Sequence, residues 1–248
     1  MPKTTTASNQ KHTNTLANKW SNEYIQSGIP SSVREKPSSA VVHYFNFLQS
    51  QGITTGKITD LGCGKGRNSA YLAKLGFKLT AIDLCNTAIE YINKKYTTLN
   101  INTICQDLTK PWLFSKTNQF IGAIDTFCFK HIISKSARLF YKTELKRILQ
   151  KNSYILINLA DITDNYYSQH CTIHSDKYSQ KDATLHITDP GNHIESLLYS
   201  KEALVDFFEP EFKLVNYKQV QHSSIMYGKA YQRSIHRAIF KRISPSCK

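Results

Sequence analysis

The sequence contains no long apolar run. No stretch of its 248 residues approaches eighteen consecutive apolar side chains, so no segment is expected to span a membrane. Residues 1–17 are polar, rich in Thr and Asn, and have no apolar core of the length that a secretory signal needs. We therefore expect a soluble protein with a disordered tail over residues 1–17 and a single domain over 18–248.

Paired cysteines are also absent. The six cysteines form no CxxC pair, and without a secretory signal they are expected to be reduced thiols in the cytoplasm. A metal site is not expected. The His170–His174 cluster has no second half at ligand spacing, and Asp161, Asp164 and Asn165 find no convincing further acid except Asp125.

Acidic residues are missing from the C-terminal part of the chain. The formal net charge is +14, and residues 212–248 carry eight Lys or Arg and no Asp or Glu. A terminal basic strip of this kind attracts phosphate without reading bases, which keeps RNA open as a partner. A solvated basic surface explains the same charge equally well.

What the sequence does have is a regular alternation. Short apolar strands such as 57–61 and 78–84 are separated by helical patterns of about ten to fifteen residues up to residue 158. This alternation predicts a Rossmann-like, doubly wound α/β fold with a mostly parallel sheet. Residues 161–199 interrupt it with about forty polar and aromatic residues, and a loop of that length is usually functional, so we expect a binding insert.

The C-terminal segments 212–221 and 229–243 are expected to close the sheet as an antiparallel hairpin. Arg233, Ile235, Arg237 and Ile239 would then lie on one face of the second strand. The four-residue spacing of its basic residues would also suit an amphipathic helix. We prefer the hairpin because it would complete the sheet.

Three glycines, Gly62, Gly64 and Gly66, follow the first strand in "KITDLGCGKGRNSAYLA". Glycines at this edge of a parallel sheet let the backbone approach a bound nucleoside. A dinucleotide loop would have the spacing GxGxxG, whereas this loop is GxGxG, preceded by Asp60 and followed by Arg67. The spacing therefore argues against a nicotinamide-dependent dehydrogenase.

This loop, Asp83 at the end of the second strand and Asp107 in "QDL" after the third together resemble the class I S-adenosylmethionine-dependent methyltransferases, over roughly residues 40–158. The resemblance implies S-adenosyl-L-methionine as the cofactor. Asp83 would accept from the two ribose hydroxyls, since a carboxylate can accept from both at once, and Asp107 would accept from the adenine amino group. The resemblance further assigns the methionine part and the adenine ring to Asp60, Gly62, Gly64, Gly66, Leu84, Leu108 and Asp125.

More loosely, "CFKH" after the fourth strand, the segment 18–39 and "LADITDNYY" resemble the thiopurine and tellurite-resistance type of small-molecule methyltransferase. This resemblance implies an N-terminal lid over 18–39 and a pocket roofed by the 161–199 insert. His131 is the candidate general base, because the ordinary pKa of histidine suits proton transfer near neutrality; a capping or surface role is the alternative. Residues expected to contact cofactor or substrate are Trp20, Tyr24, Arg34, Tyr166 and Tyr167.

Base-modifying signatures are absent from the fourth-strand motif. It contains neither an Asp/Asn-Pro-Pro-aromatic run nor a Pro-Cys nucleophile, and Cys128 stands between two phenylalanines, where packing is the simpler role. We expect direct SN2 methyl transfer to a small molecule. An RNA methyltransferase using the basic strip and a non-catalytic S-adenosylmethionine-binding protein are the alternatives.

Overall fold

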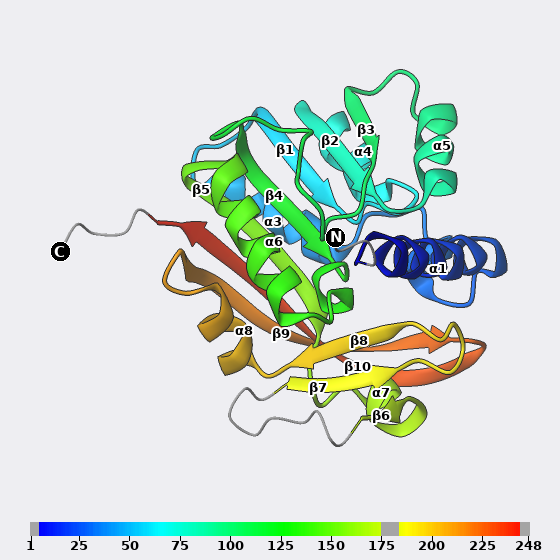
Figure 1. The fold of residues 1–248 in the computed structure, drawn as a ribbon. Helices are drawn as coiled ribbons and strands as arrows, with labels where there is room; N and C mark the ends of the chain where they lie inside the picture. Colours follow the sequence, from blue (N-terminus) through cyan, green and yellow to red (C-terminus); the bar gives the residue numbers. More distant parts are fainter. Residues whose placement is uncertain (1–4, 175–183, 244–248) are drawn as a thin grey trace.

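A seven-stranded sheet forms the centre of the fold (Figure 1). The computed structural model describes residues 5–174 and 184–243. The strand order is β3-β2-β1-β4-β5-β10-β9, parallel throughout except for β10, which pairs antiparallel with both β5 and β9. The strands are β1 (Gly56–Leu61), β2 (Phe77–Asp83), β3 (Ile101–Cys105), β4 (Phe120–Thr126), β5 (Leu149–Ala160), β9 (Phe212–Met226) and β10 (Lys229–Arg242).

Helices cover both faces of this sheet. On one face, α3 (Ser39–Ser50) and α4 (Arg67–Lys74) pack side chains such as Tyr44, Leu48 and Leu72 against the strands. On the other face, α6 (Lys135–Ile148) and α8 (Lys201–Phe208) contribute a second buried cluster. The helix α5 (Asn86–Lys95) packs beside β2. The predicted doubly wound, Rossmann-like fold is confirmed.

The central strands are buried on both faces, as their composition predicts. In β5, every residue from Ser153 to Ala160 is buried, and the apolar residues from Tyr154 to Ile157 alternate between the two clusters. A near-continuous apolar run is what a parallel strand covered by helices requires. Because β1 to β5 are parallel, their carboxyl ends lie at the same edge of the sheet, and the glycine loop lies at that edge.

The C-terminal segments form the expected hairpin, with β9 and β10 joined at Tyr227 and Gly228. Gly228 adopts a φ of +79°, a conformation that glycine reaches without steric cost. Because β10 pairs with β5 at one side and β9 at the other, the helical alternative for this segment is wrong.

The 161–199 insert contains regular structure that the sequence did not indicate. It includes α7 (Asn165–His170) and a three-stranded antiparallel sheet of β6 (Thr172–Ile173), β7 (Thr184–Thr188) and β8 (Glu195–Tyr199). This sheet lies beside the β9-β10 hairpin in Figure 1. Its core includes the buried side chains of Ile187 and Leu198. The insert is thus a small packed layer at the end of the main sheet.

The N-terminal segment also differs from expectation. Helix α1 spans Thr5–Gln26, so residues 5–17 are helical where the sequence predicts a disordered tail; residues 1–4 lie outside the described residues. A four-residue turn of helix, α2 (Pro30–Val33), follows. In Figure 1, α1 lies across the end of the sheet where β1 and β2 stop.

No helix in the described part of the chain is both long and apolar enough to cross a membrane. The five cysteines at positions 63, 85, 105, 128 and 171 are free thiols, and Cys247 lies outside the described residues.

Candidate active site

The glycine loop turns sharply between β1 and α4. Gly62, Gly64 and Gly66 have φ values of +71°, +53° and +75°. An added Cβ would lie 2.4 Å from the Cβ of Cys128 at the first position and 3.0 Å from the Tyr24 hydroxyl at the second. Side chains are excluded there both by backbone conformation and by close protein neighbours. Gly66 is the N-cap of α4 and, unlike Gly62 and Gly64, does not line the cavity described next.

Two acidic residues stand at neighbouring strand ends beside this loop. Asp83 accepts from the Gly64 amide at 2.8 Å through Oδ2 and from the Cys85 amide at 2.9 Å through Oδ1. Burial raises the pKa of Asp83, and these amide bonds partly oppose the rise. Asp107 uses Oδ1 for both donors of Thr109, while its Oδ2 is buried and has no partner among the described residues.

A cavity of about 160 Å³ lies between these groups and α1. Its wall combines the loop backbone, the two carboxylates and apolar side chains, an arrangement suited to a nucleoside. The expected residues that line it are Trp20, Tyr24, Arg34, Gly62, Gly64, Asp83, Leu84, Asp107, Leu108 and His131.

Asp60 and Asp125 do not line this cavity. Asp60 is fully buried under the loop, where its Oδ2 accepts from the Ser69 hydroxyl at 2.6 Å, and burial raises its pKa to about 7. Asp125 accepts from the Phe129 amide and, at 2.7 Å, from the Tyr141 hydroxyl; burial raises its pKa to about 6. The direct cofactor contacts expected of both residues are not available in this arrangement. They fix the loop and the turn after β4 instead.

A second, larger cavity of about 440 Å³ adjoins the first. It lies between the main sheet edge, the 161–199 insert and the β9-β10 hairpin. Six residues line both cavities and therefore form a shared wall: Trp20, Arg34, Ser38, Arg67, Phe127 and His131. A molecule in one cavity would meet a molecule in the other at these side chains.

His131 ends the short 3-10 helix η1 (Phe129–His131) after β4 and stands in this shared wall. Its Nδ1 lies 2.9 Å from the carbonyl oxygen of Glu195 on β8, and its Nε2 is buried without a hydrogen-bond partner among the described residues. A carbonyl oxygen only accepts, so Nδ1 carries the proton and Nε2 has a free lone pair. Burial, and then the charge of Lys130, hold the pKa of His131 well below its usual value. The Trp20 ring packs edge-on against the imidazole at 5.0 Å.

Lys130 is a site residue that the sequence analysis did not single out. Its side chain is only 3% exposed, and its Nζ donates to the Tyr167 hydroxyl at 2.6 Å and the Ser196 hydroxyl at 3.2 Å. Lys130 is part of the motif "CFKH", directly before His131, so it could have been proposed as a site residue. Nothing in the sequence indicates, however, that this lysine is buried.

The two tyrosines of α7 have different positions. Tyr167 lines the larger cavity, as expected, whereas Tyr166 is fully buried and donates to Asp189 at 2.8 Å. The substrate contact expected of Tyr166 is therefore not available. Successive residues on a short helix face different ways, and in α7 Tyr166 is the one turned into the core.

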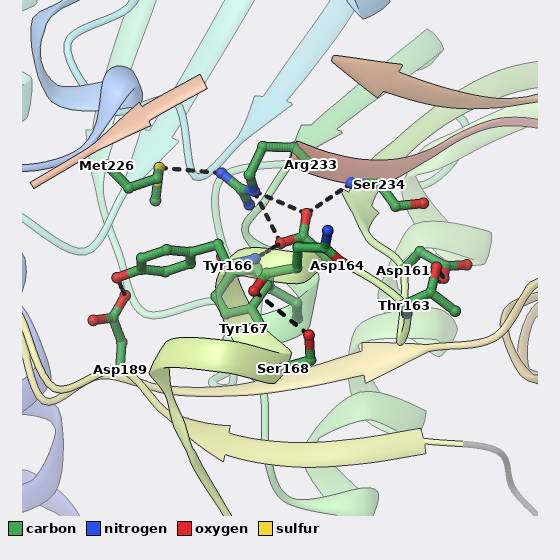
Figure 2. A network of polar contacts seen from close by, with 12 residues as sticks. Asp161, Thr163, Asp164, Tyr166, Tyr167, Ser168, Asp189, Met226, Arg233 and Ser234 are labelled. Atoms are coloured by element: carbon green, nitrogen blue, oxygen red, sulfur yellow. Dashed lines mark hydrogen bonds and ion pairs between the residues drawn. The ribbon is translucent and has the colours of Figure 1, made fainter. Parts of the chain in front are cut away.

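Arg233 and Asp164 form a buried ion pair next to the larger cavity (Figure 2). The Nε of Arg233 lies 2.9 and 2.8 Å from the two carboxylate oxygens, and the Ser234 amide also donates to Asp164. In the same segment, Asp161 binds Thr163 and His236. These acids thus serve ion pairs and turns of the fold.

A family model described as tellurite resistance protein TehB matches residues 39–186, which is more than half of the chain. The chain belongs to the TehB family. The matched region includes the glycine loop, both strand-end acids and His131. The first helix and the β9-β10 hairpin lie outside it.

Curated relatives of this TehB-family chain are methyltransferases. A probable S-adenosyl-L-methionine-dependent methyltransferase TehB of Haemophilus influenzae is 44% identical over 54 residues, which cover 21% of this chain and 19% of that protein. The match thus spans about a fifth of that relative's length. An uncharacterized methyltransferase of Schizosaccharomyces pombe is 33% identical over 113 residues, covering 43% of this chain and 73% of the relative.

Solved structures show the same fold. The 1,6-didemethyltoxoflavin-N1-methyltransferase of Burkholderia thailandensis, solved with its namesake compound and S-adenosylhomocysteine, superposes with a TM-score of 0.68 at 14% identity, covering 98% of this chain and 93% of that one. TehB from Haemophilus influenzae superposes with a TM-score of 0.59 at 20% identity, covering 84% and 62%. The family match and the shared fold confirm the predicted resemblance to the class I S-adenosylmethionine-dependent methyltransferases.

Proposed function

We propose that this TehB-family chain transfers the methyl group of S-adenosylmethionine to a small molecule held in the larger cavity. The observation that carries the proposal is the shared wall: His131 lines both cavities, and its buried Nε2 has no hydrogen-bond partner among the described residues. A methyl donor on one side and an acceptor on the other would meet at this residue.

The residues of the smaller cavity fit the cofactor. The unpartnered Oδ2 of Asp107 can accept from an exocyclic amine, with Leu84 and Leu108 as apolar neighbours of a ring. Each oxygen of Asp83 has one amide donor and keeps a further lone pair for a ribose hydroxyl. When bound, S-adenosylmethionine supplies a methyl group already activated by its sulfonium charge.

The chain's own residues then have two tasks, orientation and proton removal. The two cavities fix where acceptor and donor lie, and correct placement alone accounts for much of the rate of a two-substrate reaction. His131 takes the acceptor's proton at Nε2, because its Nδ1–H is held by Glu195 and because its low pKa keeps it neutral near pH 7.

The segment 18–39 is proposed to act as the lid. Helix α1 is bound to the end of the sheet beside the smaller cavity. The thiol of Cys85, which follows β2, donates to the carbonyl of Ala17 in α1 at 3.3 Å. Lys65 of the glycine loop in turn donates to the Tyr24 carbonyl at 2.9 Å. Opening and closing of this segment would control access to the smaller cavity. We also propose that the protein is located in the cytoplasm.

Calorimetric titration tests the cofactor half of the proposal. We expect S-adenosylmethionine and S-adenosylhomocysteine to bind and NAD not to bind. Asp83→Ala should weaken both adenosyl ligands by at least about tenfold, because hydrogen bonds to a charged acceptor are lost. The control is Asp206→Ala, which removes an exposed acid on α8 and should change nothing. Binding of NAD alone, or equal affinity in Asp83→Ala, would contradict the proposal.

Two alternatives are separated by their own measurements. RNA methylation would rest on the basic residues of 212–248, but Arg233 and Arg237 line the larger cavity and Arg242 binds Asn118 and the Leu149 carbonyl. RNA binding that weakens steeply with salt would favour it. Cofactor binding with no methyl transfer across a broad acceptor panel would favour a non-catalytic binding protein.

A further inference from the structure

The larger cavity has an unusual charge. Its wall includes six cationic side chains and a single carboxylate, Asp189, which already accepts from Tyr166 and Gly191. Only one of the six, Arg233, forms an ion pair among the described residues. The other five are Arg34, Lys36, Arg67, Lys130 and Arg237.

Part of this charge can be assigned to the cofactor. Arg34 and Arg67 line both cavities, so either can approach the carboxylate of a bound amino-acid moiety. Lys36, which also lines only the larger cavity, is exposed to solvent, whereas Lys130 and Arg237 line that cavity alone and are buried or half-buried. Their charges are therefore available to whatever occupies that cavity.

Of these two cations, Lys130 is the more deeply buried and therefore has the greater need of a polar partner. Lys130 is only 3% exposed and has no carboxylate partner in the described part of the chain. Burying an ammonium in this way costs free energy of folding unless acceptors satisfy its N–H groups and a negative charge balances it. It stands 4.4 Å from the centre of the Tyr167 ring, and two neutral hydroxyls accept from it. Because an ammonium has three N–H donors, one remains for a ligand.

Arg237 shows the same incomplete pairing on the cavity floor. Its Nη2 donates to the Ser39 hydroxyl at 2.9 Å, while its Nε is buried without a partner among the described residues. Two residues earlier on the same face of β10, Ile235 also lines the cavity. The floor thus places a cation beside apolar surface.

The remaining wall contains both polar and apolar side chains. Ile29, Ile194, Val220 and Met226 join Ile235 around the cationic groups. A cavity of about 440 Å³ has the size of a site for an organic molecule. Its chemistry matches a compound with one apolar body and one acidic group.

We infer that the methyl acceptor is an organic acid, whose carboxylate or phosphate is bound by Lys130 and whose apolar body fills the space above Ile235, with Arg237 as a second cation. This inference rests on the proposed function, because it treats the larger cavity as the acceptor site. The Ser196 hydroxyl lies 3.2 Å from Nζ of Lys130 and 3.1 Å from Nδ1 of His131, so an acid bound at Lys130 would bring the neighbouring part of the acceptor near the proposed base.

The test measures binding in protein saturated with S-adenosylhomocysteine, so it does not depend on which atom is methylated. The probes are 2-naphthoate and phenyl phosphate, each compared with neutral 2-naphthamide. We expect at least one acid to bind about tenfold or more tightly than the amide, since bonds between charged groups are the stronger ones. Lys130→Met should remove that preference and leave the affinity for the amide unchanged.

Lys78→Met is the matched control, because Lys78 is exposed on β2 and lines neither cavity. It should preserve the preference for the acid. If Lys130→Met does not fold, Arg237→Gln serves in its place and should reduce the preference several-fold. The inference is overturned if the amide binds as well as both acids, if no probe binds, or if the folded Lys130→Met protein keeps the full preference. Failure of S-adenosylhomocysteine itself to bind would instead overturn the proposed function.

Discussion

The imidazole of His131 is held by the backbone of Glu195, whose carbonyl oxygen lies 2.9 Å from Nδ1. This contact joins the turn after β4 to strand β8 of the insert. Two segments 64 residues apart thereby set the tautomer of one side chain and leave Nε2 as the atom that can accept a proton. The insert thus orients the proposed base as well as enclosing the larger cavity.

The first prediction concerns the pH dependence of methyl transfer. Because burial and Lys130 lower the pKa of His131, the imidazole is neutral through the neutral range and becomes protonated only well below pH 6.5. The rate should therefore be flat near neutrality and fall as pH decreases through that low pKa. His131→Gln should reduce kcat by about 10²- to 10⁴-fold while S-adenosylhomocysteine still binds.

The cause of the low pKa can be tested separately by NMR titration of the His131 ring. Lys130→Met removes the second cause and should raise the pKa of His131, whereas Lys78→Met should leave it in place. Two results would show that another group removes the proton. One is a methyl-transfer rate that already falls at the ordinary histidine pKa as pH decreases, and the other is an undiminished rate in His131→Gln.

The second prediction concerns the two reasons why Gly62 cannot carry a side chain, backbone strain at positive φ and close contact with Cys128. Each should contribute separately to the stability lost in Gly62→Ala. Gly62 and Gly52 have nearly the same φ, +71° and +74°, but a Cβ at Gly52 meets nothing within 4 Å, whereas at Gly62 it would lie 2.4 Å from the Cβ of Cys128. Gly52→Ala should cost about 1–2 kcal/mol of stability from backbone strain alone. Gly62→Ala should cost clearly more, as measured by urea unfolding.

The additional cost at Gly62 comes from one neighbour, so it should be recoverable. In a Cys128→Gly background, which lacks that neighbour's Cβ, the further change Gly62→Ala should cost about as much stability as Gly52→Ala costs in the unaltered protein. Equal losses in the two single variants would mean that Cys128 moves aside freely and that the loop tolerates a side chain.

The strand-end residues were predictable because the sheet itself brings them together. Asp83 and Asp107 each follow a strand whose apolar run and flanking helix are visible in the sequence, and the ends of parallel strands meet at one edge. Asp60 and Asp125 have the same sequence signature. Both are buried, and their hydrogen-bond partners Ser69 and Tyr141 are residues that no local pattern connects to them.

The larger cavity was much less predictable. Lys130 is defined by partners 37 and 66 residues further along the chain, and the insert that carries them contains short strands without a strong alternating pattern. The first half of helix α1 was missed for a related reason, because its residues are polar and carry no apolar periodicity, whereas the helical spacing of Trp20, Tyr24 and Ile25 indicates the second half. Residues whose environment comes from distant segments leave no local signal.

The third prediction concerns the buried pair of Arg233 and Asp164 in Figure 2, which joins strand β10 to the start of helix α7. Asp164 is fully buried and Arg233 only 5% exposed, so removing one partner leaves a buried charge without compensation. Asp164→Asn and Arg233→Met should each cost about 3–5 kcal/mol of stability in urea unfolding. Glu35→Gln is the control, since its pair with Lys95 lies at the surface and contributes little.

The double variant distinguishes an ion pair from two independent structural residues. Once Arg233 is replaced by methionine, the carboxylate of Asp164 has lost its charge partner, so the further change Asp164→Asn should cost much less than it does in the unaltered protein. Strictly additive losses would show that the backbone bonds from Tyr166 and Ser234 to Asp164, and not the charge of Arg233, hold the insert against the hairpin. The pair would then matter for the cavity only through the position of its side chains.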